Sequence, residues 1–558
     1  MSVRNGIVLL VALSTLLFLA ACGGNGTSIA TPVAPPSGAF SNSNLNGTYV
    51  FSISGTDVNG APYAMAGTFT ANGSGGNGKG GITGGTLDIN DSSVFSAPAA
   101  GVSINNNSSY SVTADGRGQA VIGTNITSGT PGQTFPNLTF DFVLTDSTHG
   151  LITEFDSFGS GSGTLDLQAA NTTPTGTYAF SLSGVTSTDS SWATVGNFTV
   201  TGSTIAGLDD LNEGGILPYA NSTLSGSLVL GPSATPATTL SINNNGSSVF
   251  SGTFDTIAID ATHLKFIEMD ATATLSGDAF SQTSATLPTG TLAFTLDGIS
   301  SGQLYAAGGF MSTAATGAIT GSEDYNVGGT NLSSQTAPAA FSAAFTAAGA
   351  GRFTLGSFTT FVGGTSYAAY PSSGGLLLLE TDATGITFGA AYTQTPGAVL
   401  AASQGYGMNL SGVNLSGIGN GPVEVDDIAE FTTATGGTLT GIIDENYDPT
   451  EGTSGATLGI PLTSGSYGAI DSNGRYGLAA TAVTSNGNAG TLLGGFTLTT
   501  YAVDGTTFPF IELDGGQVST GVIVLQNPSA SSAAIAHSHM FVVRPLIMSH
   551  KASKKKTK

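Results

Sequence analysis

Pairs of carboxylates recur four times along the chain, two residues apart. Each pair is a Glu-x-Asp motif, with a Gly nine and a Gln fourteen residues after the Glu: Glu154/Asp156/Gly163/Gln168, Glu268/Asp270/Gly277/Gln282, Glu380/Asp382/Gly389/Gln394 and Glu512/Asp514/Gly521/Gln526. Side chains two apart on a strand point to the same face, so each pair places two acids together. Glycosidases also use two carboxylates, but from separate elements that flank one cleft. One active site does not need four copies, so we expect a structural role; a carbohydrate-active enzyme is the weaker alternative.

Three arginines follow a Gly in equivalent turns, one in each of three copies of the pattern. A planar guanidinium can bind a carboxylate through two parallel hydrogen bonds, which suits it to a buried acid. The arginine precedes the Glu of its own copy by 37 residues in the first and fourth copies and by 28 in the third, where a shorter intervening hairpin would explain the difference. The sequence therefore predicts three structural ion pairs, Arg117–Glu154, Arg352–Glu380 and Arg475–Glu512. The second copy lacks this arginine, but Lys265 lies three residues before Glu268.

A second motif, Gly-x-x-Asp-x-Asn, precedes the carboxylate pair in each copy. It is found at Gly85/Asp88/Asn90, Gly207/Asp210/Asn212, Gly321/Asp324/Asn326 and Gly441/Asp444/Asn446, with further acids nearby, among them Asp448 and Glu451. Calcium binds several oxygen ligands on a loop, so such sites could hold it. Asp and Asn also cap turns by bonding to their own backbone. The turn-capping reading is favoured, and neither a metal nor a cofactor is expected.

Motifs for nucleophilic catalysis are weak in this sequence. The Gly-x-Ser-x-Gly at 298–302 follows an expected strand, whereas a hydrolase nucleophile needs this motif between a strand and a helix. His149 and His263 occupy the same turn of the first two copies and have no counterpart in the other two. The sequence contains no His-Glu-x-x-His, EF-hand loop or phosphate loop. No catalytic residue is therefore predicted, and we expect the protein not to be an enzyme.

The elements that carry these residues are expected to be strands. Gly47-Thr-Tyr-Val-Phe-Ser-Ile-Ser-Gly recurs at 176–184 and 290–298, and more weakly at 404–412. Large apolar residues alternate with small ones in each copy, which indicates a half-buried strand. Turn residues recur roughly every 8–12 positions, so each copy should hold about seven or eight antiparallel strands. We predict an all-β chain of four meandering barrels; the alternative, an immunoglobulin-like sandwich, lacks its usual core markers, since Trp192 is the single Trp and no cysteine pair exists.

The repeats and the composition divide the chain into seven segments. These are a signal peptide at 1–22, a flexible spacer at 23–42, β-repeats at 43–169, 172–283, 286–395 and 400–527, and a basic tail at 528–558 that we expect to be disordered. Hydrophobic residues make up 40% of the chain, which is too many for a disordered protein. Each repeat is long enough to bury its own core.

The first residues have the features of an export signal. Arg4 precedes an apolar stretch at 7–20, which is short for a membrane span, and small residues lead to Cys22. The Leu19-Ala-Ala-Cys22 ending resembles the lipobox of bacterial lipoproteins, in which the cysteine is acylated and becomes the mature N-terminus. This resemblance implies a lipid anchor on Cys22, and Gly23 in place of Asp implies sorting to the outer membrane. Cys22 is the only cysteine, so no disulfide can form within the chain.

Charge is unevenly distributed along the chain. All 35 acidic residues lie between the signal and residue 514, together with five cations, Lys79, Arg117, Lys265, Arg352 and Arg475. Such an acidic body excludes nucleic-acid binding, which needs a basic surface. The tail carries six cations, which could contact anionic lipid, although a solvated terminus is the simpler interpretation.

Taken together, the lipobox, the Gly-x-Tyr-x-Phe opening, the Gly-Arg turn and the closing Glu-x-Asp strand resemble repeat-containing lipoproteins of environmental Gram-negative bacteria. The second copy departs from this pattern because it lacks the Gly-Arg turn. The resemblance implies an exported periplasmic or surface protein and implies no activity. We expect a non-enzymatic surface, adhesion or spacer role with an unidentified cell-surface or matrix partner; a lipocalin-like carrier of a small apolar ligand is the alternative.

Overall fold

The computed structural model describes residues 32–529 except 75–77, 127–136, 216, 335, 357, 359–361, 416–421, 448–456 and 483–494. Strands make up 66% of the structure and helix 1%, so the all-β prediction is confirmed. One short 3-10 helix, η1 (Asn42–Asn44), precedes the first strand. No helix in the described part of the chain is long and apolar enough to cross a membrane.

The chain forms four closed antiparallel barrels of eight strands, numbered 1 to 4 in chain order. Barrel 1 contains β1 (Asn46–Asp57), β2 (Pro62–Asn72), β3 (Gly80–Asp91), β4 (Ala99–Ser103), β5 (Ser109–Val112), β6 (Arg117–Ile122), β7 (Leu138–Leu144), β8 (His149–Phe155) and β9 (Gly159–Leu167). Barrel 2 contains β10 (Gly176–Thr186), β11 (Ser191–Thr201), β12 (Thr204–Glu213), β13 (Leu217–Ser227), β14 (Thr238–Asn244), β15 (Ser247–Ala258), β16 (His263–Glu268) and β17 (Ala273–Ser281).

Barrels 3 and 4 follow the same plan. Barrel 3 contains β18 (Gly290–Ser300), β19 (Gln303–Thr313), β20 (Ala318–Val327), β21 (Asn331–Leu332), β22 (Ala339–Gly349), β23 (Arg352–Gly356), β24 (Tyr367–Ser372), β25 (Gly375–Glu380) and β26 (Gly385–Thr393). Barrel 4 contains β27 (Gly405–Asn414), β28 (Val423–Ala434), β29 (Thr438–Tyr447), β30 (Thr457–Ala469), β31 (Arg475–Ala482), β32 (Gly495–Tyr501), β33 (Thr507–Glu512) and β34 (Gln517–Leu525). The short strands β4 and β21 attach beside the closed circuits of barrels 1 and 3.

Each barrel is a meander in which the first strand also pairs with the last. In barrel 2 the strand order is sequential from β10 to β17, and β10 pairs with β17 to close the circuit. Closure of all four sheets rules out the sandwich alternative and confirms the meandering barrel. Within the described residues the strands of the four circuits are paired on both sides, and only the short strands β4 and β21 keep a free edge.

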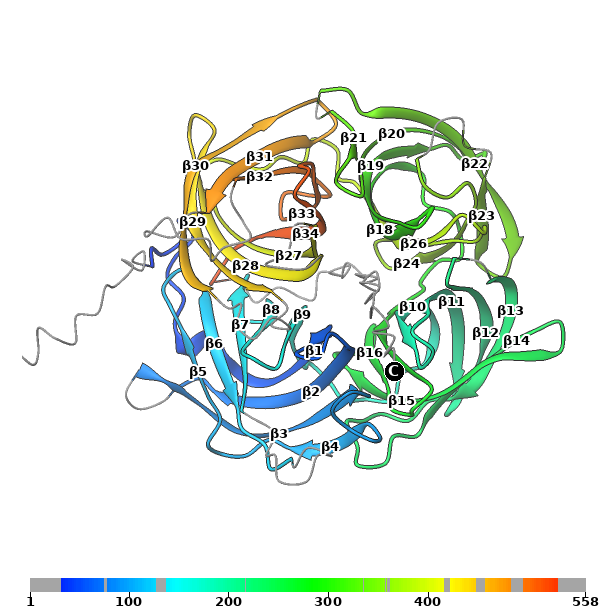
Figure 1. The fold of residues 1–558 in the computed structure, drawn as a ribbon, viewed down its shortest axis with the longest axis horizontal. Helices are drawn as coiled ribbons and strands as arrows, with labels where there is room; N and C mark the ends of the chain where they lie inside the picture. Colours follow the sequence, from blue (N-terminus) through cyan, green and yellow to red (C-terminus); the bar gives the residue numbers. More distant parts are fainter. Residues whose placement is uncertain are drawn as a thin grey trace, which may run out of the picture.

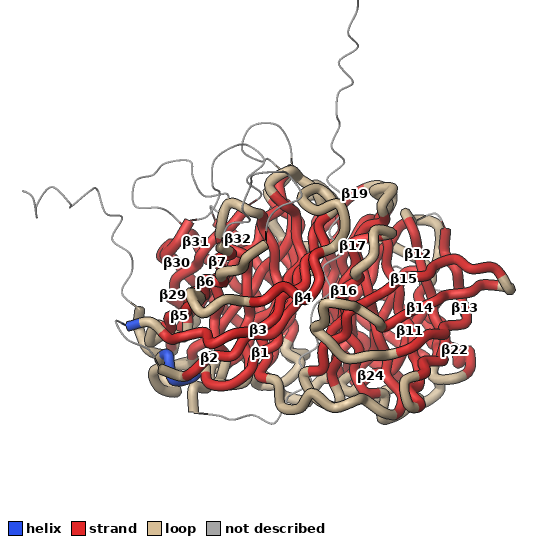
Figure 2. Tube along the Cα trace, turned by 90° about the horizontal axis from the view of Figure 1, so that it is seen from below, coloured by secondary structure: helices blue, strands red, loops and turns tan. Residues whose placement is uncertain are grey.

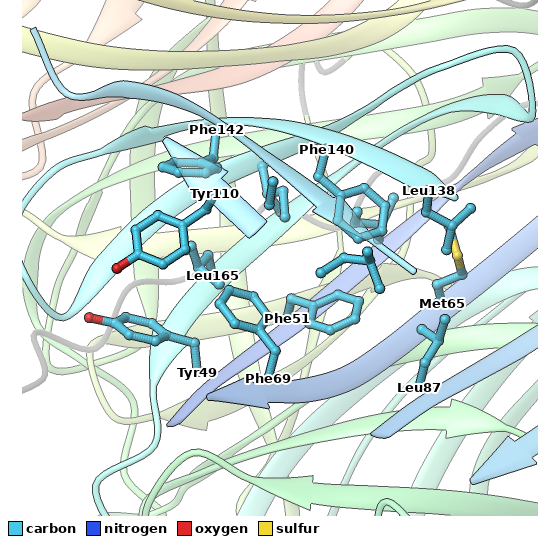
Figure 3. Close-up of a cluster of buried hydrophobic side chains, with 14 of the residues drawn as sticks. Tyr49, Phe51, Met65, Phe69, Leu87, Tyr110, Leu138, Phe140, Phe142 and Leu165 are labelled. Carbon is cyan, nitrogen blue, oxygen red and sulfur yellow. The ribbon is translucent and has the colours of Figure 1, made fainter. Parts of the chain in front are cut away.

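Apolar side chains fill the inside of each barrel, as the period-two pattern of the opening strand predicts. Tyr49, Phe51 and Ile53 of β1 alternate into the core of barrel 1 and are at most 1% exposed. Figure 3 shows this core, in which the rings of Phe51, Phe69 and Phe140 meet between opposite walls. Trp192 lies in the equivalent core of barrel 2. The filled interiors lend no support to a carrier that would hold its ligand inside the barrel.

The Gly nine residues after each motif Glu has no room for a side chain, because the backbone of the opening strand lies directly against it. A Cβ at Gly163 would lie 1.7 Å from the backbone oxygen of Ser52 on β1. The corresponding distance from an added Cβ to a backbone oxygen of the opening strand is 2.1 Å at Gly277, 2.2 Å at Gly389 and 2.2 Å at Gly521. Because a side chain at any of these positions would collide with backbone, the four Gly residues are a condition of barrel closure.

The four barrels are arranged in a ring in which barrel 4 returns to barrel 1 (Figure 1). Seen from the side, they lie next to one another in a single layer (Figure 2). Apolar clusters join each neighbouring pair; at the junction of barrels 4 and 1 the cluster consists of Val143, Leu151, Ile428 and Val524. Residues near the two ends of the described chain meet there, since Ser37 Oγ donates to Gln526 O at 2.8 Å and Asn44 Nδ2 donates to Pro528 O at 3.2 Å.

Candidate functional site

The Asn of each Asp-x-Asn motif binds the backbone of the next barrel in the ring. Its side-chain NH₂ donates to carbonyls on both sides of the hairpin that follows the motif Glu. These bonds are Asn90 to Glu268 O (2.8 Å) and Ala273 O (2.9 Å), Asn212 to Glu380 O (3.0 Å) and Gly385 O (2.9 Å), Asn326 to Glu512 O (3.0 Å) and Gln517 O (2.8 Å), and Asn446 to Glu154 O (2.6 Å) and Gly159 O (2.9 Å). The fourth set joins barrel 4 to barrel 1, so one contact repeats around the closed ring.

The Asp of the same motif binds the arginine of the next barrel at three of the four junctions. Arg352 holds both oxygens of Asp210 at 2.6 Å. Arg475 binds Asp324 in the same bidentate way, with Nε 2.7 Å from Oδ2. In both cases a buried tyrosine also donates to the Asp, Tyr370 at 2.6 Å and Tyr501 at 2.8 Å.

Arg117 makes the corresponding contact at the junction that closes the ring. Its NH1 lies 3.0 Å from Asp444 Oδ2, and its Nε lies 3.1 Å from Asp115 Oδ2 in its own barrel. The three arginines are between 2% and 8% exposed. The neighbouring carboxylates outweigh the effect of burial and raise the pKa of Arg117 and of the other two, so all three stay charged.

These contacts correct the predicted ion pairs. The structure joins Arg117, Arg352 and Arg475 to aspartates of the preceding barrel and not to Glu154, Glu380 and Glu512 of their own. The cause is strand parity: Glu512 alternates with Phe510 and Phe508, which lie in the core, whereas Arg475 is one step out of phase with the core residues Tyr476 and Leu478. The Glu therefore points into the barrel and the Arg points out of it. The arginine's partner is the recurring Asp of the Asp-x-Asn motif, for which we predicted a turn-capping role.

Inside the barrels the motif glutamates accept bonds from hydroxyl and amide groups. Tyr63 donates to Glu154, Asn90 to Glu268 at 2.6 Å, Thr384 and Thr387 to Glu380 at 2.8 Å each, and Ser519 to Glu512. Burial raises the pKa of Glu268 to about 10 and that of Glu380 to about 7. The Asp of each pair instead accepts backbone N–H bonds in the adjoining turns, as Asp156 does from Thr139 at 2.6 Å. In the second and third copies the two acids of the motif stay close to each other, because one threonine hydroxyl lies within hydrogen-bonding distance of both: Thr272 of Glu268 (3.3 Å) and Asp270 (2.5 Å), and Thr384 of Glu380 (2.8 Å) and Asp382 (2.5 Å).

The junction of barrels 1 and 2 is the exception. Residues 172–283 contain no arginine, and Asp88 meets Asp255 of barrel 2 instead. Gly101 N donates to Asp88 Oδ1 at 2.7 Å, and Ser233 N donates to Asp255 Oδ2 at 2.5 Å. Burial, and then the neighbouring Asp255 charge, raise the pKa of Asp88 to about 8. Two acids in this arrangement are held together by a shared proton.

The Gln that ends each copy completes the junctions. Its side-chain NH₂ donates to a backbone carbonyl of the next barrel: Gln168 to Ala258 (2.7 Å), Gln282 to Pro371 (2.8 Å), Gln394 to Ala502 (2.8 Å) and Gln526 to Leu144 (3.0 Å). Every recurring polar position of the sequence thus has a structural partner, and most of these partners lie in a neighbouring barrel.

The remaining candidate residues are engaged within their own barrels. His149 Nδ1 lies 2.6 Å from Asp166, His263 Nε2 lies 2.6 Å from Asp278, and Lys265 Nζ lies 2.7 Å from the same Asp278. Ser300 ends strand β18. Across the described ranges, no group of three His, Cys, Asp or Glu is placed to hold a metal ion. Cys22, the signal peptide, residues 23–31 of the spacer, residues 530–558 of the tail, and Asp448 and Glu451 lie outside the described residues.

Comparisons with known proteins place the chain in no family. No family model matches it, and no curated protein matches it. Among solved structures, the transferrin-binding protein B of Neisseria meningitidis aligns over 68% of this chain and 84% of its own, with 11% identity and a TM-score of 0.18. A protein assigned as AttH from Nitrosomonas europaea covers 45% of this chain and 97% of its own, with 9% identity and a TM-score of 0.17. Likenesses at these scores carry no argument about function.

Proposed function

We propose that this protein is an exported lipoprotein of the outer membrane, anchored through an acylated Cys22, and that its ring of barrels has a non-enzymatic surface, adhesion or spacer role. The observation that carries the role is the use of the recurring polar residues. Asp210, Asp324 and Asp444 bind arginines, and the motif Asn and Gln residues bind backbone, so these groups hold barrels together. A catalytic cleft would need such groups to converge on a substrate.

The closed ring supports a spacer or adhesion role because it resists separation of its parts. Each junction combines an apolar cluster with buried hydrogen bonds, and at three junctions also a buried ion pair. Removing one barrel from its neighbours would break two junctions at once. A rigid, protease-resistant body on a flexible tether is what a surface spacer requires.

The anchor is tested by metabolic labelling with an alkyne analogue of palmitate, followed by membrane fractionation. The wild-type protein is expected to be labelled and to sediment with the outer membrane, and Cys22→Ser to be unlabelled and released from it. Failure to label the wild type would overturn the anchor. Labelling with sedimentation in the inner membrane would overturn the proposed sorting.

The non-enzymatic role is tested separately with the purified protein. Chromogenic glycosides and esters are expected to show no turnover above that of the buffer. Turnover that disappears on a single substitution within one barrel would overturn the proposal, because it would locate an active site that the junction contacts do not explain.

A further inference from the structure

A cavity of about 230 Å³ lies at the junction of barrels 1 and 2, outside the filled barrel interiors. Barrel 1 lines it with the β1–β2 turn and with the loop at 92–98 that joins β3 to β4; barrel 2 lines it with the β10–β11 turn and the β16–β17 hairpin. Figure 2 shows this junction with β3 and β4 on one side and β16 and β17 on the other. Ser96, Asp189 and Ala271 of the lining are exposed, so the cavity is open to solvent.

The same place is closed at the next two junctions of the ring. Three residues separate β12 from β13, and one of them, Gly215, lies so close to barrel 3 that an added Cβ would be 2.8 Å from the carbonyl carbon of Gly385. Three residues also separate β20 from β21, where a Cβ on Gly329 would be 2.7 Å from the backbone oxygen of Gly515 in barrel 4. Counted from the motif Glu, the barrel 2 equivalents of Gly385 and Gly515 are two residues of the cavity wall, Ala273 and Ala271. With seven residues, the loop at 92–98 leaves open the space that three residues fill at these two junctions.

The loop at 92–98 is fixed in this position by barrel 1. Asp91 Oδ1 accepts a hydrogen bond from Ser93 N at 2.8 Å, and Asp91 O accepts one from Phe95 N at 3.0 Å. Ser93 Oγ also donates to Asp57. The Phe95 side chain belongs to the core of barrel 1 and lines the cavity. The cavity is therefore preformed, and a ligand does not have to order the loop in order to bind.

The cavity wall combines apolar surface with hydroxyl groups. Seven of its side chains are apolar, among them Phe95 and Pro98, and seven are polar, of which five are serines or threonines. Thr274 is 8% exposed, and its hydroxyl has no hydrogen-bond partner in the described chain. The equivalent residues of barrels 3 and 4 are Ile386 and Val518, which pack in the apolar clusters of their junctions. Barrel 2 thus carries a hydroxyl at the cavity where its neighbours carry an apolar side chain.

Asp189 supplies the one charge of the cavity wall. Its backbone has φ 61°, and its N–H donates to Thr186 O at 2.9 Å, whereas its carboxylate makes no hydrogen bond to the described residues. No Lys, Arg or His lines the cavity, so nothing there would neutralise an anionic ligand. A single exposed carboxylate holds a cation weakly, because water and salt screen its charge. It accepts strong hydrogen bonds from hydroxyl groups, since an ionised acceptor strengthens them.

We propose that this cavity, between residues 92–98 of barrel 1 and 186–189 of barrel 2, binds one neutral sugar ring in the pyranose form. A pyranose presents hydroxyls that both donate and accept, together with apolar C–H faces, and the cavity wall offers partners for both. The volume lies below the roughly 300–1,000 Å³ of pockets that hold drug-sized ligands, which suits a single ring. The site deepens the adhesion form of the proposed function, and it rests on that function in one respect, that the sugar is bound and not turned over.

The proposal is tested by saturation-transfer NMR on the purified full chain at neutral pH, with the methyl glycosides of glucose, galactose, mannose and N-acetylglucosamine as probes. At least one of them is expected to bind saturably at a single site, with a Kd on the order of 1 mM for so small a ligand. Cyclohexanol, which keeps the ring but has one hydroxyl, should bind at least tenfold more weakly. No saturable binding of any glycoside, or equal binding of cyclohexanol, would overturn the proposal.

Substitutions in exposed turns locate the site without disturbing a barrel core. Asp189→Gly keeps the left-handed backbone and removes the carboxylate, so it should weaken binding at least fivefold. Its matched control is Ser301→Gly, at φ 50° in the equivalent turn of barrel 3, which should not change binding. Ala271→Leu fills the cavity and should abolish binding, whereas Ala261→Leu, in the exposed turn at the other end of barrel 2, should leave it unchanged. Unchanged binding in either Asp189→Gly or Ala271→Leu would overturn the proposed site.

Two further measurements separate this proposal from the proposed function. An immobilised glycan that ends in the bound sugar should bind as the methyl glycoside does, because the cavity is open to solvent; binding of the free sugar alone would keep the site and overturn the adhesion role. Turnover of the corresponding p-nitrophenyl glycoside would overturn the non-enzymatic role and keep the sugar site. Absence of sugar binding would overturn the site and leave the non-enzymatic role standing.

Discussion

Asp88 of barrel 1 meets Asp255 of barrel 2 at the position where the other three junctions place an arginine against an aspartate. The ring is therefore fastened by three ion pairs and one pair of acids. An ion pair between Arg and Asp persists over the whole physiological pH range, whereas two buried acids need a proton between them. The strength of the junction of barrels 1 and 2 therefore depends on pH.

The stability of this junction should fall as the pH rises. The pKa of Asp88 is raised from 3.8 to about 8 in the folded chain, so the folded state retains a proton that the unfolded state loses. The stabilisation is complete below about pH 4 and is lost progressively up to about pH 8. Amide hydrogen exchange at Gly101 and Ser233, measured from pH 5 to pH 9 and corrected for the intrinsic rate, should show decreasing protection. Asp255→Asn should reduce this dependence; an unchanged slope would mean that the pair does not share a proton.

Replacing Arg475 by Met should destabilise the junction of barrels 3 and 4 strongly. The change leaves Asp324 buried without its bidentate partner, which costs about 3–5 kcal/mol in the free energy of unfolding. Adding Asp324→Asn should recover part of this loss, because the stranded charge is removed. Adding Glu512→Gln instead should give an additive loss, since that acid lies inside the barrel. Urea unfolding of the wild type, of the single variants Arg475→Met, Asp324→Asn and Glu512→Gln, and of the two double variants measures both couplings. Coupling to Glu512 rather than to Asp324 would contradict the assigned contacts.

Replacing Asn446 by Ala should weaken the contact that closes the ring. Two buried carbonyls, Glu154 O and Gly159 O, lose their donor, at a cost of about 2 kcal/mol. Limited proteolysis should then cut sooner between barrel 1 and the rest of the chain. The exposed Asn106→Ala is the control and should behave as wild type. Equal protease resistance of both variants would show that this contact does not secure closure.

Gly521→Ala should destabilise barrel 4, because its first and last strands lie too close together there for a side chain. The new Cβ would lie 2.2 Å from the backbone oxygen of Asn409, so the first and last strands would have to separate, at a cost of about 3 kcal/mol. Gly468→Ala, where no atom lies within 4 Å of the added Cβ, is the matched control and should lower the thermal midpoint little. Similar midpoints for the two variants would contradict the closure argument.

The sequence predicted the barrels well, because their signals are local. Alternation of Tyr49, Phe51 and Ile53 and the turn residues between strands depend only on neighbours in the chain, and all four barrels close as expected. The prediction that the recurring acids are structural also agrees with the contacts that they make.

The partners of those residues could not be predicted in the same way. Arg475 and Asp324 belong to different copies, and a repeated pattern does not show whether a pair forms within one copy or between two. The alternation of inward and outward side chains along each strand would have excluded this pair, because Glu512 points into the barrel and Arg475 points out of it.

The cyclic order of the junctions fixes how many copies the chain can hold. Each barrel offers its Asn and Gln to the following barrel and receives the same groups from the preceding one, and Asn446 and Gln526 make the last of these contacts with the first barrel. A chain of three or five copies with the same junction geometry would not close. Its two outermost barrels would leave apolar faces and unpaired polar groups in water. Gain or loss of a single repeat is therefore disfavoured by geometry alone, whereas a change within a repeat, such as the absence of the arginine from the second copy, leaves the ring closed.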